Sequence, residues 1–117
     1  MQVLVVDDSL FMRRIVQSVL VRGGHQVIGE ASNGQEAISQ YRDLKPELVM
    51  MDITMPVLNG VEALKEIISY DPNAKVLMCS AMGQIGMIEE CIEYGAKGFV
   101  TKPFNAELLL KEITRIS

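Results

Sequence analysis

The stretch VLVVDDS, residues 3–9, decides how the rest of the sequence is interpreted. Its first four residues are apolar and mostly β-branched, which is typical of a strand buried on both faces. The run ends at two adjacent aspartates, Asp7 and Asp8. An amphipathic helix follows over residues 10–22, and Gly23-Gly24 ends it. The stretch therefore predicts a buried strand, an acidic loop and a helix in succession.

The same alternation continues along the chain. Further strands are expected at 26–30, 48–51, 76–79 and 99–100, the first of them weaker and nearer a sheet edge. Helices are expected to begin at Asn33-Gly34, Asn59-Gly60, Ile85 and Asn105, and to end at Pro46, Asp71-Pro72, Gly95 and the C-terminus. Five strand–helix units without a linker predict one α/β domain over residues 1–117, with a doubly wound parallel sheet and right-handed crossovers.

Helical spacing of apolar residues indicates which helix faces meet the core. The first helix carries such a stripe at Leu10, Phe11, Ile15, Val19 and Leu20. The fourth carries one at Ile85, Ile88 and Ile92, and the last at Leu108, Leu109, Ile113 and Ile116.

The composition describes a small acidic protein. The 117 residues are 49% apolar with a net charge of −4, so the chain lacks the basic face that nucleic-acid binding requires. No apolar run approaches the roughly 18 residues that cross a membrane, and no signal-peptide pattern opens the chain, so we expect a cytoplasmic protein. Cys79 and Cys91 are expected to be reduced, buried thiols, although Cys91 could be partly exposed.

Polar residues follow the predicted strands at the sheet edge where such folds place their sites. Asp7-Asp8 follows the first strand, Asp52 the third, Ser80 the fourth and Lys102 the fifth. If the first and third strands are neighbours, three carboxylates crowd together, and this raises a pKa or requires a cation. Oxygen ligands with room for water favour Mg²⁺ over zinc.

Each of these residues also has an ordinary structural explanation. Asp8 or Ser9 could cap the first helix, aspartate is common after a strand, and Ser80 and Lys102 could be turn and surface residues. Taken together, however, the set indicates phosphoryl transfer. Asp52, the central acid, would be the nucleophile and would form an acyl phosphate, while a metal, Lys102 and Ser80 stabilise the transferred group.

Two other classes of site lack their residues. No G-x-G-x-x-G follows the first strand, and there is no G-x-x-x-x-G-K-[ST], so the phosphate cradles of dinucleotide and NTP sites are missing. His25 is the single histidine and lies in a different predicted loop from the candidate nucleophiles, which argues against acyl transfer.

Four segments in this order resemble bacterial two-component response-regulator receiver domains: VLVVDDS (3–9), MDITMPVLNG (51–60), CSAMG (79–83) and TKPF (101–104). The likeness extends over the entire chain. The stretches FMRR (11–14), DITMP (52–56) and CSAMGQ (79–84) are most similar to the single-domain chemotaxis regulators of that family. The resemblance implies a flavodoxin-like fold with strand order 2-1-3-4-5.

The resemblance also implies a role for each site residue. Asp52 would be the phosphoacceptor, with Mg²⁺ held by Asp8, Asp52, the backbone carbonyl of Thr54, and Asp7 directly or through water. Lys102 would pair with the phosphoryl group. The donor would be a phosphohistidine on a chemotaxis-type histidine kinase, and the protein would assist its own phosphorylation rather than act as an enzyme.

Signal output is implied by the same resemblance. Ser80 would bond to the phosphoryl group, and Phe99 would be the aromatic switch that turns inward as Ser80 moves. Lys102-Pro103 would be a cis bond. Phe99 lacks the hydroxyl of the tyrosine found in many relatives, which puts any bond from that hydroxyl to a partner in doubt.

No output domain is expected after the fifth helix, so output would be a binding surface. That surface would span the fourth helix, including Met87, Cys91 and Tyr94, with the fifth strand and fifth helix. The expected partner is a flagellar motor switch protein, bound by a monomer. Met82, two residues after Ser80, offers no group to orient water, so we expect slow spontaneous hydrolysis and a separate phosphatase.

Other interpretations remain open. The chain could be a phosphorelay intermediate, or a receiver domain from a longer DNA-binding regulator. An aspartyl-phosphate phosphatase is a further alternative, but that class requires a second acidic residue at the position that Thr54 occupies. A structural pseudo-receiver is disfavoured because every member of the site is present.

Overall fold

The computed structural model describes all 117 residues, and its strands form one parallel sheet. The strands are β1 (Gln2–Val6), β2 (Gln26–Ala31), β3 (Leu48–Asp52), β4 (Val76–Ser80) and β5 (Gly98–Thr101). Their order is β2-β1-β3-β4-β5, and every neighbouring pair is parallel. The predicted α/β fold and strand order are therefore confirmed, and the weaker second strand lies at an edge.

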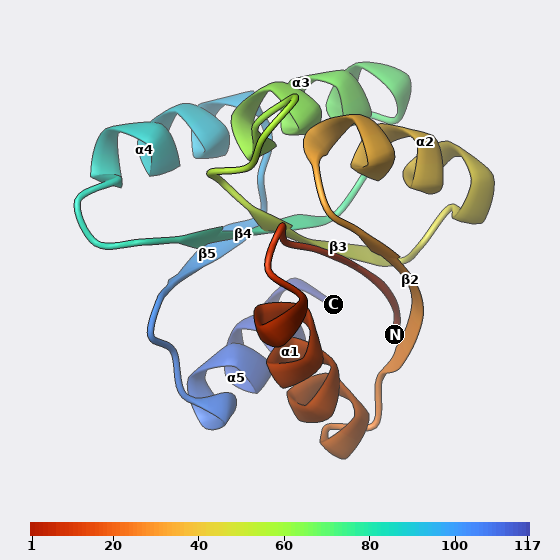
Figure 1. The fold of residues 1–117 in the computed structure, drawn as a ribbon, viewed down its shortest axis with the longest axis vertical. Helices are drawn as coiled ribbons and strands as arrows, with labels where there is room; N and C mark the ends of the chain where they lie inside the picture. The colour runs from red at the N-terminus through yellow and green to blue at the C-terminus, as the bar shows by residue number, and fades with distance from the viewer.

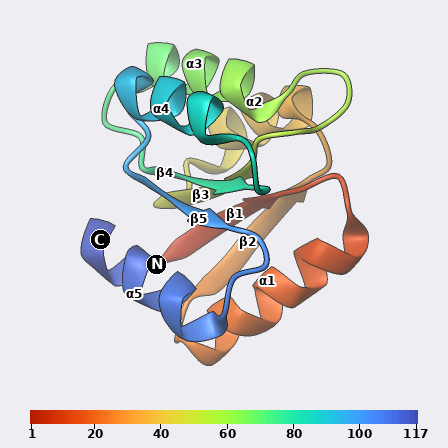
Figure 2. The same cartoon turned by 90° about the vertical axis from the view of Figure 1, so that its left-hand side faces the viewer.

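Helices cover both faces of the sheet. They are α1 (Leu10–Arg22), α2 (Gly34–Leu44), α3 (Gly60–Tyr70), α4 (Ile85–Tyr94) and α5 (Ala106–Ile116). Figure 1 shows α2, α3 and α4 on one face and α1 with α5 on the other, and Figure 2 shows the same layers from the side. From the neighbouring strands β1 and β3 the chain proceeds to opposite sides of the sheet, so a crevice is expected at their carboxyl ends.

Successive side chains of each strand point to opposite faces of the sheet, so the core is divided in two. Leu4 and Val6 of β1 belong to a cluster of 20 buried residues under α2, α3 and α4. Val3 and Val5 belong to a cluster of 12 buried residues under α1 and α5. Successive side chains of a strand point to opposite faces, and this explains why β1 and β3 are apolar at nearly every position.

Side-chain caps fix where four of the five helices begin. Ser9 caps α1 by accepting from the Met12 N–H, so Ser9 rather than Asp8 is the capping residue. Asn33, Asn59 and Asn105 cap α2, α3 and α5 in the same way. Gln84 precedes α4 but makes no such bond to the helix. The polar residues identified in the sequence therefore set most helix starts.

The predicted core stripe of α1 is partly wrong. Its buried residues are Val16, Val19 and Leu20, whereas Leu10, Phe11 and Ile15 are exposed. The first turns of α1 adjoin the polar end of β1. There the guanidinium of Arg13 bonds to the Asp7 carbonyl oxygen at 2.7 Å and to Glu30 at 2.9 Å, in place of an apolar contact.

The expected faces of α4 are also corrected. Ile88 and Cys91 are buried, while Ile85 and Ile92 are exposed. Cys91 is fully buried, so its expected partial exposure and its place on a binding surface are wrong. The helix packs beside α3 along positions 88 and 91, which are three residues apart and therefore lie on one side of a helix.

Candidate functional site

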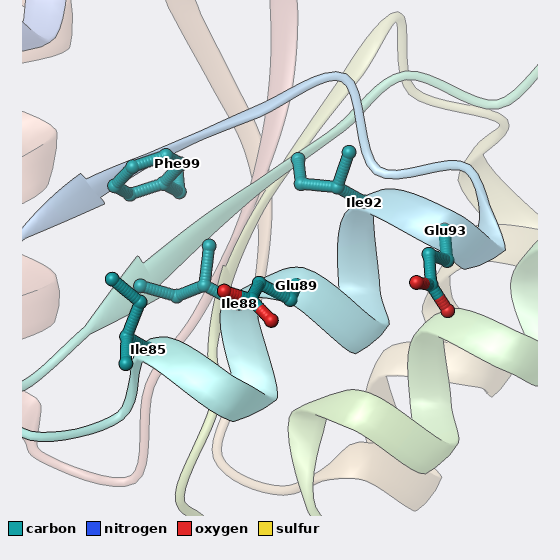
Figure 3. Close-up of a pocket in the computed structure, with 6 residues that line it drawn as sticks. All are labelled: Ile85, Ile88, Glu89, Ile92, Glu93 and Phe99. Carbon is teal, nitrogen blue, oxygen red and sulfur yellow. The ribbon is translucent and has the colours of Figure 1, made fainter.

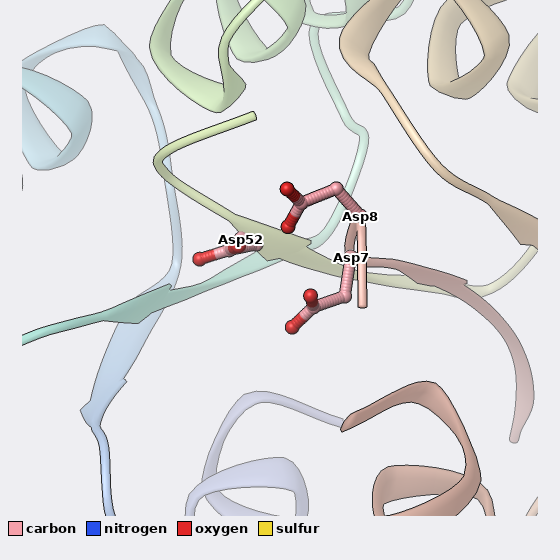
Figure 4. Close-up of side chains that lie close together, drawn as sticks. All are labelled: Asp7, Asp8 and Asp52. Atoms are coloured by element: carbon pink, nitrogen blue, oxygen red, sulfur yellow. The ribbon is translucent and has the colours of Figure 1, made fainter. Parts of the chain in front are cut away.

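Three carboxylates converge at the carboxyl ends of β1 and β3. Val6 of β1 is paired with Met51 of β3, so the residues that follow them, Asp7-Asp8 and Asp52, meet at the same edge. One oxygen from each carboxylate lies within 4.8 Å of the other two. Figure 4 shows the three side chains gathered around this point. The expected adjacency of the first and third strands is confirmed.

The donor set fits a hard divalent cation. All three groups are carboxylates, and Asp7 and Asp52 are buried while Asp8 is exposed. Lys102 supplies one positive charge against three negative ones. Oxygen-only donors with one side open to water suit Mg²⁺, which keeps several water ligands. The acidic triad can therefore bind a metal ion.

Lys102 lies against two of the three acids. Its Nζ donates to Asp7 Oδ2 at 2.9 Å and lies 3.3 Å from Asp52 Oδ1. Burial works against the ammonium charge, but the hydrogen bond to Asp7 and the charge of Asp52 outweigh it and raise the pKa of Lys102. The Lys102-Pro103 peptide bond is cis, as the resemblance implies. The backbone N–H of Lys102 also donates to the Ser80 carbonyl oxygen at 2.7 Å.

Asp52 is the member of the acidic triad whose pKa is raised. Burial is the main cause that raises its pKa, to about 6, and the charges of Asp7 and Asp8 add to it while Lys102 opposes it. A cation bound among these groups would favour the ionised form. The single positive charge of Lys102 therefore does not fully offset burial and the two neighbouring carboxylates.

Ser80 and Thr54 are placed differently around Asp52. Ser80 is fully buried at the end of β4, and its hydroxyl faces the Val100 carbonyl oxygen across 3.5 Å. Thr54, in the loop after β3, is exposed, and its Oγ1 accepts a hydrogen bond of 2.6 Å from Gln84. The predicted residues thus follow the carboxyl ends of neighbouring strands, while the hydroxyl of Ser80 points toward β5.

Two residues that contact this region were not foreseen from the sequence. Arg13 bonds to the carbonyl of Asp7, and Gln84 reaches Thr54 from the loop before α4. A basic residue in the first turn of a helix was the one visible signal for Arg13, since that position disfavours positive charge. No feature of the sequence around Gln84 predicted its hydrogen bond to Thr54.

An apolar groove lies between α4 and β5. It is a cavity of about 430 Å³ lined by Ile85, Ile88, Ile92 and Phe99 with two glutamates. Figure 3 shows Phe99 lying over the isoleucines of α4. Phe99 is 44% exposed, so its ring lies at the surface of the groove and not in the core.

Comparison with known proteins gives the family. Residues 3–114 match the family model described as the response regulator receiver domain. The chain belongs to the response-regulator receiver family. It is a phosphoacceptor signalling domain of the CheY type rather than a classical enzyme.

Curated relatives support the chemotaxis-type likeness. The chain is 48% identical to the chemotaxis protein CheY of Thermotoga maritima, covering 99% of this chain and 97% of the relative. It is 46% identical to CheY of Bacillus subtilis, covering 97% and 95%. None of the five helices has the length and apolar character that crossing a membrane demands.

A similar solved chain comes from a complex that contains Mg²⁺ and BeF₃. The structure of a CheX–CheY–BeF₃–Mg²⁺ complex from Borrelia burgdorferi contains a chain with a TM-score of 0.95 to this one. The two chains are 33% identical, and the match covers 98% of this chain and 87% of the other.

Proposed function

We propose that the chain takes a phosphoryl group from a chemotaxis-type histidine kinase on Asp52. The observation that carries this proposal is the placement of Asp52 between two further carboxylates and the Lys102 ammonium. A carboxylate oxygen of Asp52 attacks phosphorus, the phosphorus–nitrogen bond of the phosphohistidine breaks, and the electron pair leaves with the imidazole nitrogen, which takes up a proton. The product is an acyl phosphate.

The neighbouring residues have assigned parts in this step. Asp7, Asp8 and Asp52, with the backbone carbonyl of Thr54, would hold Mg²⁺, which supplies charge neutralisation for the transferred group. Lys102 is 3.3 Å from the attacking carboxylate, close enough to pair with an oxygen of the phosphoryl group. The Ser80 hydroxyl donates to another of these oxygens once it turns from Val100.

Mass measurement tests the phosphoacceptor. The parent, Asp52→Asn and Asp43→Asn are incubated with Mg²⁺ and acetyl phosphate, and the intact mass is recorded. Asp43 is an exposed acid on α2 and serves as the matched control. We expect one phosphoryl group on the parent and the control and none on Asp52→Asn. Modification of Asp52→Asn to the same extent would place the acceptor elsewhere.

The proposed output surface is the groove between α4 and β5 together with α5. We infer that phosphorylation draws Ser80 toward Asp52 and lets Phe99 turn inward, and that the reshaped groove binds a flagellar motor switch component. The chain's likeness to chemotaxis proteins named CheY supports this choice of partner. Replacing Phe99 or Ile92 by Ala should weaken binding of the phosphorylated protein, whereas Tyr70→Ala, on α3, should not.

Loss of the phosphoryl group is proposed to need a separate phosphatase. Met82 is 83% exposed and presents a thioether where a polar group would orient water. We expect Met82→Gln to speed the spontaneous decay of the acyl phosphate, measured by intact mass over time. An unchanged decay rate would remove this explanation.

A further inference from the structure

The side chain of Gln84 joins the two loops on either side of Asp52. Its Oε1 accepts the Ala81 N–H at 2.6 Å, and its Nε2 donates to Thr54 Oγ1, also at 2.6 Å. Ala81 directly follows Ser80, and Thr54 stands two residues after Asp52. One amide group therefore bridges the β3–α3 loop and the β4–α4 loop.

This bridge takes the place of a helix cap. Gln84 is the residue before α4, and its side chain makes no bond to that helix, unlike the serine and asparagines before the other four. Gly83, with φ +87°, precedes it and Gly86 follows two residues later, and a Cβ at either would meet no atom within 4 Å. The start of α4 thus has little packing of its own, and the bridge ties it to the site.

The bridge also bears on the Ser80 hydroxyl. That hydroxyl now faces Val100 O across 3.5 Å, which is too long for a strong hydrogen bond. Ala81 follows Ser80 directly, so a backbone shift of Ser80 moves the N–H that Gln84 accepts. Both bonds of the bridge are made in the arrangement in which Ser80 faces β5.

We propose that Gln84 is a positioning residue that holds the two loops and the start of α4 in the resting arrangement. This inference rests on the proposed function, because it concerns the shift that follows phosphorylation of Asp52. The bridge stabilises one of two states, so its removal favours the other, and a phosphoryl group or its analogue then binds more tightly.

Calorimetric titration with BeF₃⁻ at saturating Mg²⁺ tests the proposal. Gln84→Met keeps a long unbranched side chain and loses both bonds. We expect its dissociation constant for BeF₃⁻ to fall about threefold to tenfold, the equivalent of one to two exposed hydrogen bonds. Gln35→Met changes an exposed glutamine in the first turn of α2 and should leave the constant unchanged.

A double-mutant cycle identifies the bridge itself. Thr54→Val removes the hydroxyl that Gln84 contacts. We expect the double variant Thr54→Val with Gln84→Met to bind no more tightly than the tighter single variant. Additive effects of the two changes would show that they do not act through one contact.

The outcomes separate the two proposals. A Gln84→Met protein that binds BeF₃⁻ as the parent does, or more weakly, overturns the resting-state role while the phosphoacceptor function stands. A parent that neither binds BeF₃⁻ nor accepts a phosphoryl group from acetyl phosphate overturns both. Hydrogen exchange at the first turn of α4 gives a second readout, and faster exchange in Gln84→Met than in Gln35→Met is expected.

Discussion

Asp52 lies in an environment that opposes its own charge. It is buried, two other carboxylates adjoin it, and Lys102 alone offsets them. Its pKa is raised to about 6 from an ordinary value of 3.8. The folded protein therefore binds this proton more tightly than the unfolded chain does.

A pH dependence of stability follows for the protein in a chelator. The stabilisation from protonated Asp52 is complete below pH 3.8 and is lost as the pH rises through about 6. The loss amounts to at most about 3 kcal/mol. Urea unfolding at a series of pH values should show this decline in the parent and in Asp43→Asn, but not in Asp52→Asn. The same decline in all three proteins would assign it to other groups.

Val57 has a strained backbone conformation. It is exposed, with φ 67°, and the Leu58 N–H closes a tight turn around it by donating to Pro56 O at 2.7 Å. Left-handed backbone is costly for a β-branched residue, by about 1–3 kcal/mol. Glycine relieves that cost but gives back about 0.5–1 kcal/mol of chain entropy.

We therefore expect Val57→Gly to raise the free energy of unfolding by about 1 kcal/mol. The matched change Val21→Gly, at an exposed valine within α1, should lower it by about 0.5 kcal/mol. Chemical denaturation of both variants checks the opposite signs. Destabilisation of similar size in both would mean that the turn stores no strain.

The site residues that directly follow a strand could be predicted from the sequence. Asp7, Asp8, Asp52 and Lys102 each follow an apolar run, and parallel strands bring such positions to one edge. The bonds of Arg13 and Gln84 were not predictable, because they depend on how far a long side chain reaches across two loops.

At the scale of elements, the capping residues in the sequence predicted where helices begin, but the apolar stripes did not predict which helix faces are buried. Ser9 and the asparagines at 33, 59 and 105 mark the starts correctly. The burial of α1 and α4 departs from the apolar stripes because each helix carries more apolar residues than the side facing the sheet can cover. Phe11 and Ile85 meet solvent rather than the core.

Gly60 shows how closely one helix approaches the site strand. It begins α3, its N–H donates to Ile53 O at 2.7 Å, and a Cβ there would overlap the backbone carbonyl of Asp52. Gly60→Ala should lower the free energy of unfolding by about 2–3 kcal/mol and weaken Mg²⁺ binding.

Gly86→Ala is the contrasting change. A Cβ at Gly86, within α4, meets nothing within 4 Å, so alanine should stabilise the protein by about 1 kcal/mol through helix propensity. Thermal unfolding and Mg²⁺ titration of both variants test the pair. A Gly60→Ala protein with the parent's stability would contradict the close approach.

At the scale of the whole molecule, metal binding is coupled to folding. The three acids are brought together by two strands that lie more than forty positions apart in the chain, so the unfolded chain has no such cluster. An ion that binds the folded form alone stabilises it, by about 2.7 kcal/mol at a hundredfold excess over its dissociation constant.

We expect Mg²⁺ to raise the thermal midpoint of the parent and of Asp43→Asn, and to have little effect on Asp8→Asn. The midpoint is measured with MgCl₂ and with NaCl at equal ionic strength, so that screening is held constant. Equal midpoints for the parent in the two salts would argue against an ion site at the acidic triad.

The pairing of Lys102 with Asp7 spans 95 positions of the chain. It joins the loop after the first strand to the loop after the last one, so it depends on β1, β3, β4 and β5 lying in their native order. A chain that stops short of β5, or one whose sheet is misassembled, lacks this lysine beside the acids. The pairing therefore couples the arrangement of the acids at one end of the chain to the correct placement of the other end.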